Sequence, residues 1–201
     1  ERQNGRCVFT AEWDKHAVRT YKENFPDSDD IWGDITKKEP TAIPDHDLLL
    51  AGFPCQPFSL AGVSKKNSLG RAHGFLDKTQ GTLFFNIVSI LRAKQPPAFL
   101  LENVKNLRSH DGGRTYAVIV GALRELGYHV TDRVVGASAW VPQRRERVFL
   151  VGFRKPVHFD FDALGRPERA PTLGDILHSP KEEPEEPYTS VRRGRTVVGA
   201  R

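Results

Sequence analysis

The residue of this sequence best placed to do chemistry is Cys55, a cysteine between two prolines. It lies in the segment 52–59, Gly-Phe-Pro-Cys-Gln-Pro-Phe-Ser, directly after the apolar run 48–51. The prolines withhold two backbone donors and fix φ around the cysteine, so the turn keeps its shape without ladder hydrogen bonds. A stiff turn at the end of a buried strand is typical of a cysteine that is held in position as a nucleophile. The alternative is a cysteine that packs in the protein interior and is chemically inert. The turn alone leaves both interpretations open.

A glutamate, an asparagine and two arginines indicate what Cys55 would attack. Glu102 and Asn103 follow the apolar stretch 98–101, and burial at such a position disfavours a charged carboxylate. A neutral acid beside a thiolate suits addition to an electron-poor ring, because the acid can protonate the ring as the thiolate adds. The Asn103 amide can hold an amide or an exocyclic amine, and Arg145 and Arg147 can clamp a phosphate.

Two further carboxylates, Glu12 and Asp34, also follow short apolar segments. In doubly wound sheets, acids at strand ends contact the ribose and base of a nucleoside. Taken singly, each carboxylate is more often a helix cap or a solvated loop charge. Because the carboxyl ends of parallel strands share one edge of the sheet, we expect both acids to meet Cys55 and Glu102 there and to form a ligand site.

Apolar periodicity predicts the elements that must position these residues. Strand-like runs alternate with helical ones, and several strands are apolar on both faces. The sequence therefore predicts an α/β fold: a doubly wound, mostly parallel sheet with helices on both sides. A long polar loop is expected over residues 60–74. The predicted strands are 6–11, 47–53, 98–101, 128–137 and 148–153, with a brief apolar segment at 31–36, and the predicted helices are 14–24, 82–94 and 114–126.

Composition restricts the class of protein. The 201 residues suffice for one domain with a core, and 38% hydrophobic and 27% charged residues describe a globular protein without an apolar run of membrane length. The only cysteines, Cys7 and Cys55, exclude a disulfide scaffold and an unaided zinc site and favour a reducing, cytoplasmic compartment. A net charge of +5 makes a polyanionic partner plausible.

The chain changes character after residue 153. Residues 154–201 contain six prolines and the acidic run 182–186, which is typical of a linker or the start of an incomplete unit. We therefore predict a catalytic domain over 1–153 and a linker with the start of a second region over 154–201. The chain begins at Glu1 and contains no methionine, so we expect a piece of a longer protein.

Other thiol chemistries fit the sequence less well. A cysteine phosphatase loop requires an arginine a few residues after the cysteine, where Leu60 and Ala61 stand instead. A papain-like protease requires a histidine base, and none of the seven histidines follows a predicted strand in a convincing way. A thiol hydrolase therefore stays a distant alternative.

The motifs together closely resemble the 5-methylcytosine DNA methyltransferases, in particular the bacterial Dcm-type subgroup. The likeness covers roughly residues 5–153 and continues faintly to about residue 190. The segment 52–59 is similar to the catalytic motif of that family, and 143–147 is similar to its Gln-x-Arg-x-Arg motif. In chain order, the six matching motifs are Glu12-Trp13, Asp34-Ile35, 52–59, 81–84, 101–104 and 143–147.

This resemblance implies a mechanism in which a target cytosine is flipped out of duplex DNA. Cys55 would add to ring carbon 6 while Glu102 engages ring nitrogen 3, and S-adenosylmethionine would supply the methyl group for carbon 5. The implied catalytic residues are Cys55, Glu102, Asn103 and Arg145. The implied cofactor contacts are Glu12, Trp13, Asp34, Ile35, Pro54 and Leu83. The residues expected to shape the site and contact DNA are Gln56, Ser59, Gln143 and Arg147. No metal site is expected.

The sequence also departs from the family pattern. The family begins with a glycine-rich cofactor loop that nothing before Glu1 supplies, and most of a target-recognition domain and the last two motifs are missing. We therefore expect the middle of an enzyme, acting as a monomer on double-stranded DNA in the cytoplasm, with a cognate restriction endonuclease as a further partner. The alternatives are an RNA cytosine methyltransferase and a non-catalytic nucleic-acid-binding remnant.

Overall fold

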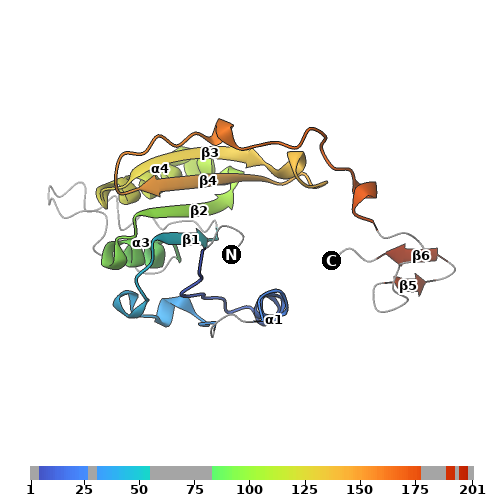
Figure 1. The fold of residues 1–201 in the computed structure, drawn as a ribbon, viewed down its shortest axis with the longest axis horizontal. Helices are drawn as coiled ribbons and strands as arrows, with labels where there is room; N and C mark the ends of the chain where they lie inside the picture. Colours follow the sequence, from blue (N-terminus) through green and yellow to red (C-terminus); the bar gives the residue numbers. More distant parts are fainter. Residues whose placement is uncertain (1–4, 27–30, 55–82, 178–188, 193–194, 199–201) are drawn as a thin grey trace. The chain divides into compact units, whose positions relative to one another are not determined.

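A computed structural model of the chain describes residues 5–26, 31–54, 83–177, 189–192 and 195–198 (Figure 1). Cys55 and the loop predicted at 60–74 lie outside these residues. The chain divides into two compact units, 1–136 with 146–164 and 137–145 with 165–201. The second unit contains the antiparallel strands β5 (Thr189–Arg192) and β6 (Arg195–Val198). The domain boundary expected at residue 153 stays a prediction.

The first unit is built on a four-stranded sheet in the order β1-β2-β4-β3. Its strands are β1 (Leu48–Gly52), β2 (Ala98–Val104), β3 (His129–Gly136) and β4 (Glu146–Phe153). β1 pairs with β2 in parallel, and β4 runs antiparallel to both β2 and β3. Three strands therefore run in one direction, and the reversed β4 begins at the edge where β1 and β2 end.

Two helices cover one face of this sheet. α3 (Leu83–Lys94) and α4 (Arg114–Glu125) share a core with inward residues of the strands, among them Leu49, Phe99 and Leu150. On the opposite face, Leu48 and Leu50 stay 51% and 65% exposed. The structure thus shows α3 and α4 on the same face, whereas the sequence predicted helices on both sides. Figure 1 shows α3 beside β1 and β2, and α4 beside β3.

The two central strands, β2 and β4, approach each other closely near the start of β2 and the end of β4. Gly152 lies opposite Phe99, and a Cβ atom at Gly152 would come within 2.2 Å of the Phe99 ring. Phe99 in turn packs edge-on against Tyr128, with ring centroids 5.0 Å apart. The Tyr128 hydroxyl donates to the Pro96 carbonyl oxygen over 2.8 Å. The ring of Phe99 therefore occupies the space that the missing side chain of Gly152 leaves.

Most predicted elements are confirmed, and the differences have physical reasons. α1 (Lys15–Asn24) begins after its predicted cap, Asp14, whose carboxylate accepts from the amides of His16 and Ala17. The predicted strand 6–11 is wrong, because the structure forms only an isolated parallel bridge between Ala11 and Trp32.

One end of β2 and one end of β4 also differ from the bounds that the sequence predicted. β2 continues through Val104, so Glu102 lies inside the strand rather than after it. β4 begins at Glu146, inside the segment expected to be a turn, because antiparallel pairing to β2 and β3 extends that far. None of the helices in the described ranges combines the length and the apolar composition needed to cross a membrane.

Candidate active site

Glu102 lies at the centre of the residues that the sequence singled out. In the parallel register of β1 and β2, Gly52 is its partner, and a Cβ atom at Gly52 would lie 3.4 Å from Glu102 Oε2. Arg147 Nε is 2.8 Å from Glu102 Oε1, with the two side chains 22% and 35% exposed. The structure thus places a guanidinium group beside the acid that the sequence singled out.

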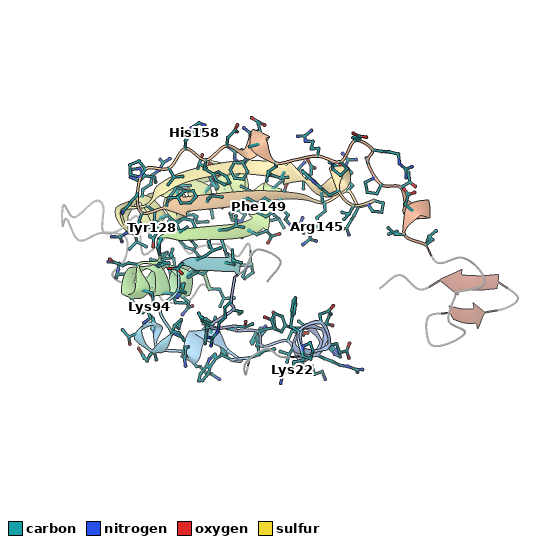
Figure 2. All side chains as sticks on the ribbon, viewed as in Figure 1. Lys22, Lys94, Tyr128, Arg145, Phe149 and His158 are labelled. Atoms are coloured by element: carbon teal, nitrogen blue, oxygen red, sulfur yellow. The ribbon has the colours of Figure 1, made fainter. Side chains whose placement is uncertain are left out.

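Arg147 reaches Glu102 because β4 is antiparallel to its neighbours β2 and β3. It faces Val104 in the ladder, and its Nη1 also donates to the Glu146 carbonyl oxygen over 3.0 Å. A residue at the start of an antiparallel strand lies at the same sheet edge as residues at the ends of its neighbours. Figure 2 shows Phe149 further along β4, and this residue is directly opposite Glu102. The contact between Arg147 and Glu102 was not predicted from the sequence, which assigned Arg147 to phosphate binding and to the shape of the site.

Asn103 points to the other face of the sheet and is 2% exposed. Its Nδ2 donates to the Phe53 carbonyl oxygen over 2.7 Å, and its Oδ1 accepts from the Val104 amide over 2.8 Å. Both polar atoms of this buried amide therefore bind backbone, as a buried polar group requires. The contact joins β2 to the turn that continues from Phe53 into Pro54, an exposed residue. Cys55, Gln56 and Ser59 follow outside the described residues.

Glu12 and Asp34 follow the two segments joined by the Ala11–Trp32 bridge. The Glu12 amide donates to the Trp32 carbonyl oxygen over 2.8 Å, and Trp32 Nε1 donates to the Asp34 carbonyl oxygen over 3.1 Å. Glu12 Oε1 also accepts from the Asp14 amide over 2.8 Å. The two acids are thus held in neighbouring backbone segments, and the Glu12 carboxylate also binds the local backbone. Their meeting with Cys55 and Glu102 at one sheet edge stays a prediction.

Two hydrogen bonds from Thr36 stabilise the ionised form of Asp34. The Thr36 hydroxyl donates to Asp34 Oδ1 over 2.7 Å, and the Thr36 amide donates to the same oxygen over 3.0 Å. These two bonds lower the pKa of Asp34 below its ordinary value, because they stabilise the carboxylate form. Nearby, Trp13 is 78% exposed, and Ile35 packs against the core.

Two further residues of the predicted site, Gln143 and Arg145, belong to the second unit. The Arg145 carbonyl oxygen accepts from the Ala137 amide over 2.9 Å, and the Gln143 amide donates to the Val141 carbonyl oxygen over 2.7 Å. Leu83, expected to contact the cofactor, is the first residue of α3 in the first unit.

A sequence profile described as C-5 cytosine-specific DNA methylase matches residues 1–194. The chain belongs to this family. It is 52% identical over 208 residues to the DNA-cytosine methyltransferase of Escherichia coli K12, covering 86% of this chain and 44% of that protein. It is 49% identical to the type II methyltransferase M.HaeII of Haemophilus aegyptius, covering 86% of this chain and 50% of that protein. The predicted Dcm-type likeness is confirmed, and the chain spans about half the length of these methylases.

Solved structures agree on the fold of this methylase chain. An Escherichia coli prophage protein named as a DNA modification methyltransferase superposes with a TM-score of 0.67 at 20% identity, covering 95% of this chain and 53% of that one. A DNMT2 mutant of Spodoptera frugiperda superposes with a TM-score of 0.57 at 22% identity, covering 83% of this chain and 47% of the other. The predicted methyltransferase-type α/β fold is confirmed.

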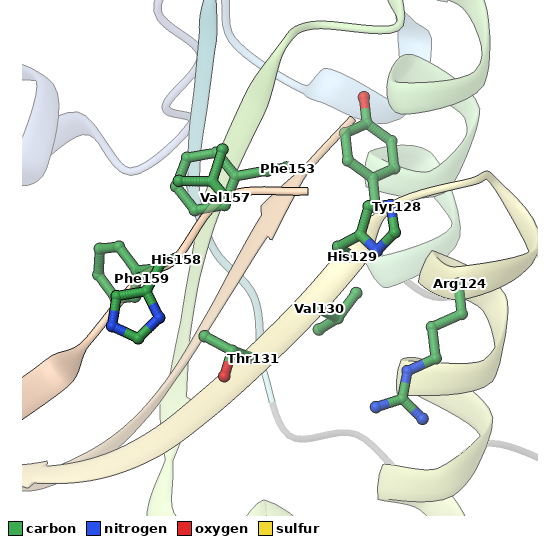
Figure 3. A pocket seen from close by; sticks show the side chains of 9 residues that line it. All are labelled: Arg124, Tyr128, His129, Val130, Thr131, Phe153, Val157, His158 and Phe159. Atoms are coloured by element: carbon green, nitrogen blue, oxygen red, sulfur yellow. The ribbon is translucent and has the colours of Figure 1, made fainter. Parts of the chain in front are cut away.

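One cavity of the methylase chain lies away from Glu102. It has a volume of about 440 Å³ and is lined from the start of β3 by His129, from the end of β4 by Phe153, and from α4 by Arg124 (Figure 3). The end of β4 and the start of β3 form the sheet edge opposite to the edge that carries Arg147 and Glu102. This cavity therefore does not belong to the candidate active site.

Proposed function

We propose that the protein carrying this chain transfers a methyl group to carbon 5 of cytosine in double-stranded DNA. The observation that carries the proposal is the placement of Glu102 between Gly52 of β1 and Arg147 of β4. β1 leads through Phe53 and Pro54 to Cys55, so the acid lies within β2 near its end, and the thiol follows the neighbouring strand β1 in the sequence. Membership of the methylase family supports the same chemistry.

Cys55 and Glu102 would divide the work on a cytosine flipped out of the duplex. The Cys55 thiolate forms a bond to ring carbon 6, and the carbon 5–carbon 6 double bond breaks. The displaced pair forms a carbon 4–carbon 5 double bond, and the nitrogen 3–carbon 4 pair moves onto ring nitrogen 3, which takes the proton of a protonated Glu102 carboxyl group and leaves carbon 5 nucleophilic. After carbon 5 is methylated, ring nitrogen 3 returns its proton to Glu102, a base removes the proton of carbon 5, the carbon 5–carbon 6 double bond reforms and the thiolate leaves. Arg147 would orient the Glu102 carboxyl group throughout.

Asn103 would act as a positioning residue. Its hydrogen bond to the Phe53 carbonyl oxygen fixes the backbone two residues before Cys55, and its other polar atom holds Val104. Because both polar atoms bind backbone, we assign Asn103 to the geometry of the thiol turn rather than to direct contact with the base. Correct placement of reacting groups is worth orders of magnitude in rate.

S-adenosylmethionine would be held near Glu12 and Asp34. The residues there fit its adenosine part, because the ionised Asp34 and Glu12 can accept hydrogen bonds from ribose hydroxyls, and the exposed indole of Trp13 can stack on a base. Ile35, Pro54 and Leu83 would add apolar contacts. When bound, this cofactor supplies an electrophilic methyl group.

DNA would be contacted by residues on either side of the thiol and in the segment before β4. Arg145 would pair with the phosphate of the flipped nucleotide, while Gln56, Ser59 and Gln143 would shape the pocket around the base. The net charge of +5 favours a polyanion. M.HaeII is named a type II methyltransferase, so we extend the proposal to a monomer that protects DNA alongside a restriction endonuclease.

The direct test uses the full-length protein, duplex DNA and S-adenosylmethionine with a tritiated methyl group. We expect label on carbon 5 of cytosine and none with the Cys55→Ala variant. Label on transfer RNA in preference to DNA would redirect the substrate class to RNA. Absence of label from both nucleic acids, or label that survives Cys55→Ala, would contradict the proposal.

A further inference from the structure

Two ion pairs hold the first two residues of β4 from opposite faces of the sheet. Lys105 Nζ is 2.6 Å from Glu146 Oε2, and Arg147 Nε is 2.8 Å from Glu102 Oε1. Glu146 and Arg147 are consecutive residues of one strand, so their side chains point to opposite faces. Both pairs lie at the sheet edge of the candidate active site, and sequence reasoning predicted neither of them.

The Lys105–Glu146 pair extends the ladder between β2 and β4 by one position. The last paired residues of these strands are Val104 and Arg147. One step further in the antiparallel register, Lys105 comes opposite Glu146, but the backbone after Val104 turns into the short 3-10 helix Lys105–Arg108. A side-chain contact therefore continues the pairing where backbone pairing ends.

The arrangement of charges opposes a slip of β4 by one residue in either direction. A slip one way would bring Glu146 into the place of Arg147 and set two carboxylates, Glu146 and Glu102, side by side. A slip the other way would bring Arg147 opposite Lys105 and set two cations together. Like charges in opposed positions of a sheet are destabilising. Buried Val148 and Leu150 fix the middle of the strand, whereas these ion pairs fix its end.

We propose that Lys105 is a positioning residue. Its ion pair with Glu146 fixes the register of the first residues of β4 and thereby keeps the Arg147 guanidinium in contact with the Glu102 carboxylate. This proposal rests on the methyltransferase function proposed above. Both side chains of the Lys105–Glu146 pair are partly exposed, at 49% and 39%, and such pairs contribute little to overall stability. The role of the pair is therefore local: it sets the place of the guanidinium beside the catalytic acid, where small displacements are costly to rate.

A double-mutant cycle in the full-length protein tests this role. The variants are Lys105→Met, Glu146→Gln and the two together, with Lys105→Arg as the conservative replacement. The matched control is Lys94→Met, which removes the same charge from the Lys94–Asp45 pair, a 2.8 Å contact at the end of α3 (Figure 2). Steady-state methylation gives kcat and the KM for DNA at several salt concentrations, and thermal unfolding checks that each variant folds.

We expect each single variant to lower kcat about tenfold with little change in the KM for DNA. The double variant should be no slower than either single variant, because both remove one interaction. Lys105→Arg should retain most of the rate, and Lys94→Met should match the parent protein. Unchanged kcat in Lys105→Met, or additive losses in the double variant, would overturn the proposal. A rise in KM and a reduced salt slope from Lys105→Met alone would identify a phosphate contact instead.

Amide hydrogen exchange gives a second readout that does not depend on activity. Backbone amides of residues 146–148 should exchange roughly tenfold faster in Lys105→Met and Glu146→Gln, while that of Leu150 stays protected. Unchanged exchange at 146–148 would show that the Lys105–Glu146 pair does not fix the start of β4, even if the enzyme is active. If the parent protein transfers no methyl group, the proposed function fails, but the exchange rates still test whether this pair fixes the start of β4.

Discussion

Asn103 Nδ2 donates a 2.7 Å hydrogen bond to the carbonyl oxygen of Phe53, so a buried residue of β2 holds the backbone two positions before Cys55. We expect Asn103→Leu to lower the free energy of unfolding by about 1–3 kcal/mol, because the variant leaves the Phe53 carbonyl and the Val104 amide without their partner. Because the thiol turn loses its anchor, kcat should fall about a hundredfold. Chemical denaturation and single-turnover methylation measure the two effects.

The control for that variant is Asn106→Ala, at an exposed asparagine three residues further along the chain. It should leave both kcat and stability close to those of the parent protein. An Asn103→Leu variant with normal single-turnover rates would show that the turn does not depend on this hydrogen bond.

Glu102 and Arg147 should respond differently to substitution. Glu102→Gln keeps the shape of the side chain but removes the transferable proton, so kcat should fall at least about a hundredfold. Arg147→Lys keeps the charge but loses the Nε contact with Glu102, and should cost about tenfold, since lysine cannot reproduce guanidinium geometry. Neither change should lower the melting temperature much, because the pair is partly exposed. Equal kcat in Glu102→Gln and the parent protein would exclude Glu102 as the acid.

Two glycine-to-alanine variants should change stability in opposite directions. Gly152→Ala places a methyl group within 2.2 Å of the Phe99 ring and should destabilise the fold by about 1–3 kcal/mol or more. Gly121→Ala adds a methyl group inside α4, where nothing lies within 4 Å, and should stabilise by about 0.5–1 kcal/mol. Urea denaturation of both variants measures this. A stable Gly152→Ala protein would mean that β2 and β4 do not approach as closely as the structure shows.

Asp34 provides a prediction about pH. Hydrogen bonds from Thr36 lower the pKa of Asp34, so its contribution to stability is present above the pKa of the unfolded chain and is lost as the pH falls through the lower, folded value. Thr36→Val removes the hydroxyl bond and should raise the pKa of Asp34 toward its ordinary value. NMR titration of the Asp34 carboxyl carbon follows this shift directly. An unchanged midpoint in Thr36→Val would show that the hydroxyl does not stabilise the carboxylate.

The sequence allowed the elements of the site to be predicted better than their connections. Apolar runs and caps located α1, α3, α4 and the four strands of the sheet, because these signals are local. The direction of β4 depends on pairing between residues 98–104 and 146–153, which no local pattern records. This reversal is the reason that Arg147, at the start of a strand, lies beside Glu102, near the end of another.

For the site residues too, the sequence identified the residues but not the contacts between them. Glu102 and Arg147 could be named from their types and motifs, but their contact depends on a long-range register. Both polar atoms of the Asn103 side chain form hydrogen bonds with the backbone. The sequence could not predict this, because an asparagine after an apolar strand is equally suited to binding a ligand. Lys105 was missed because a lone lysine after a strand carries no signal until the antiparallel register places it opposite Glu146.

The central claim is that Cys55 attacks cytosine with the assistance of Glu102, and trapping of the adduct tests it most directly. Duplex DNA containing 5-fluorocytosine should become covalently linked to the full-length protein in the presence of S-adenosylmethionine, because fluorine at carbon 5 cannot leave as a proton does. Mass spectrometry should place the link on Cys55, with no link in Cys55→Ser and a much slower one in Glu102→Gln. Methylation of ordinary DNA without any trapped link, or a link at another residue, would contradict the claim.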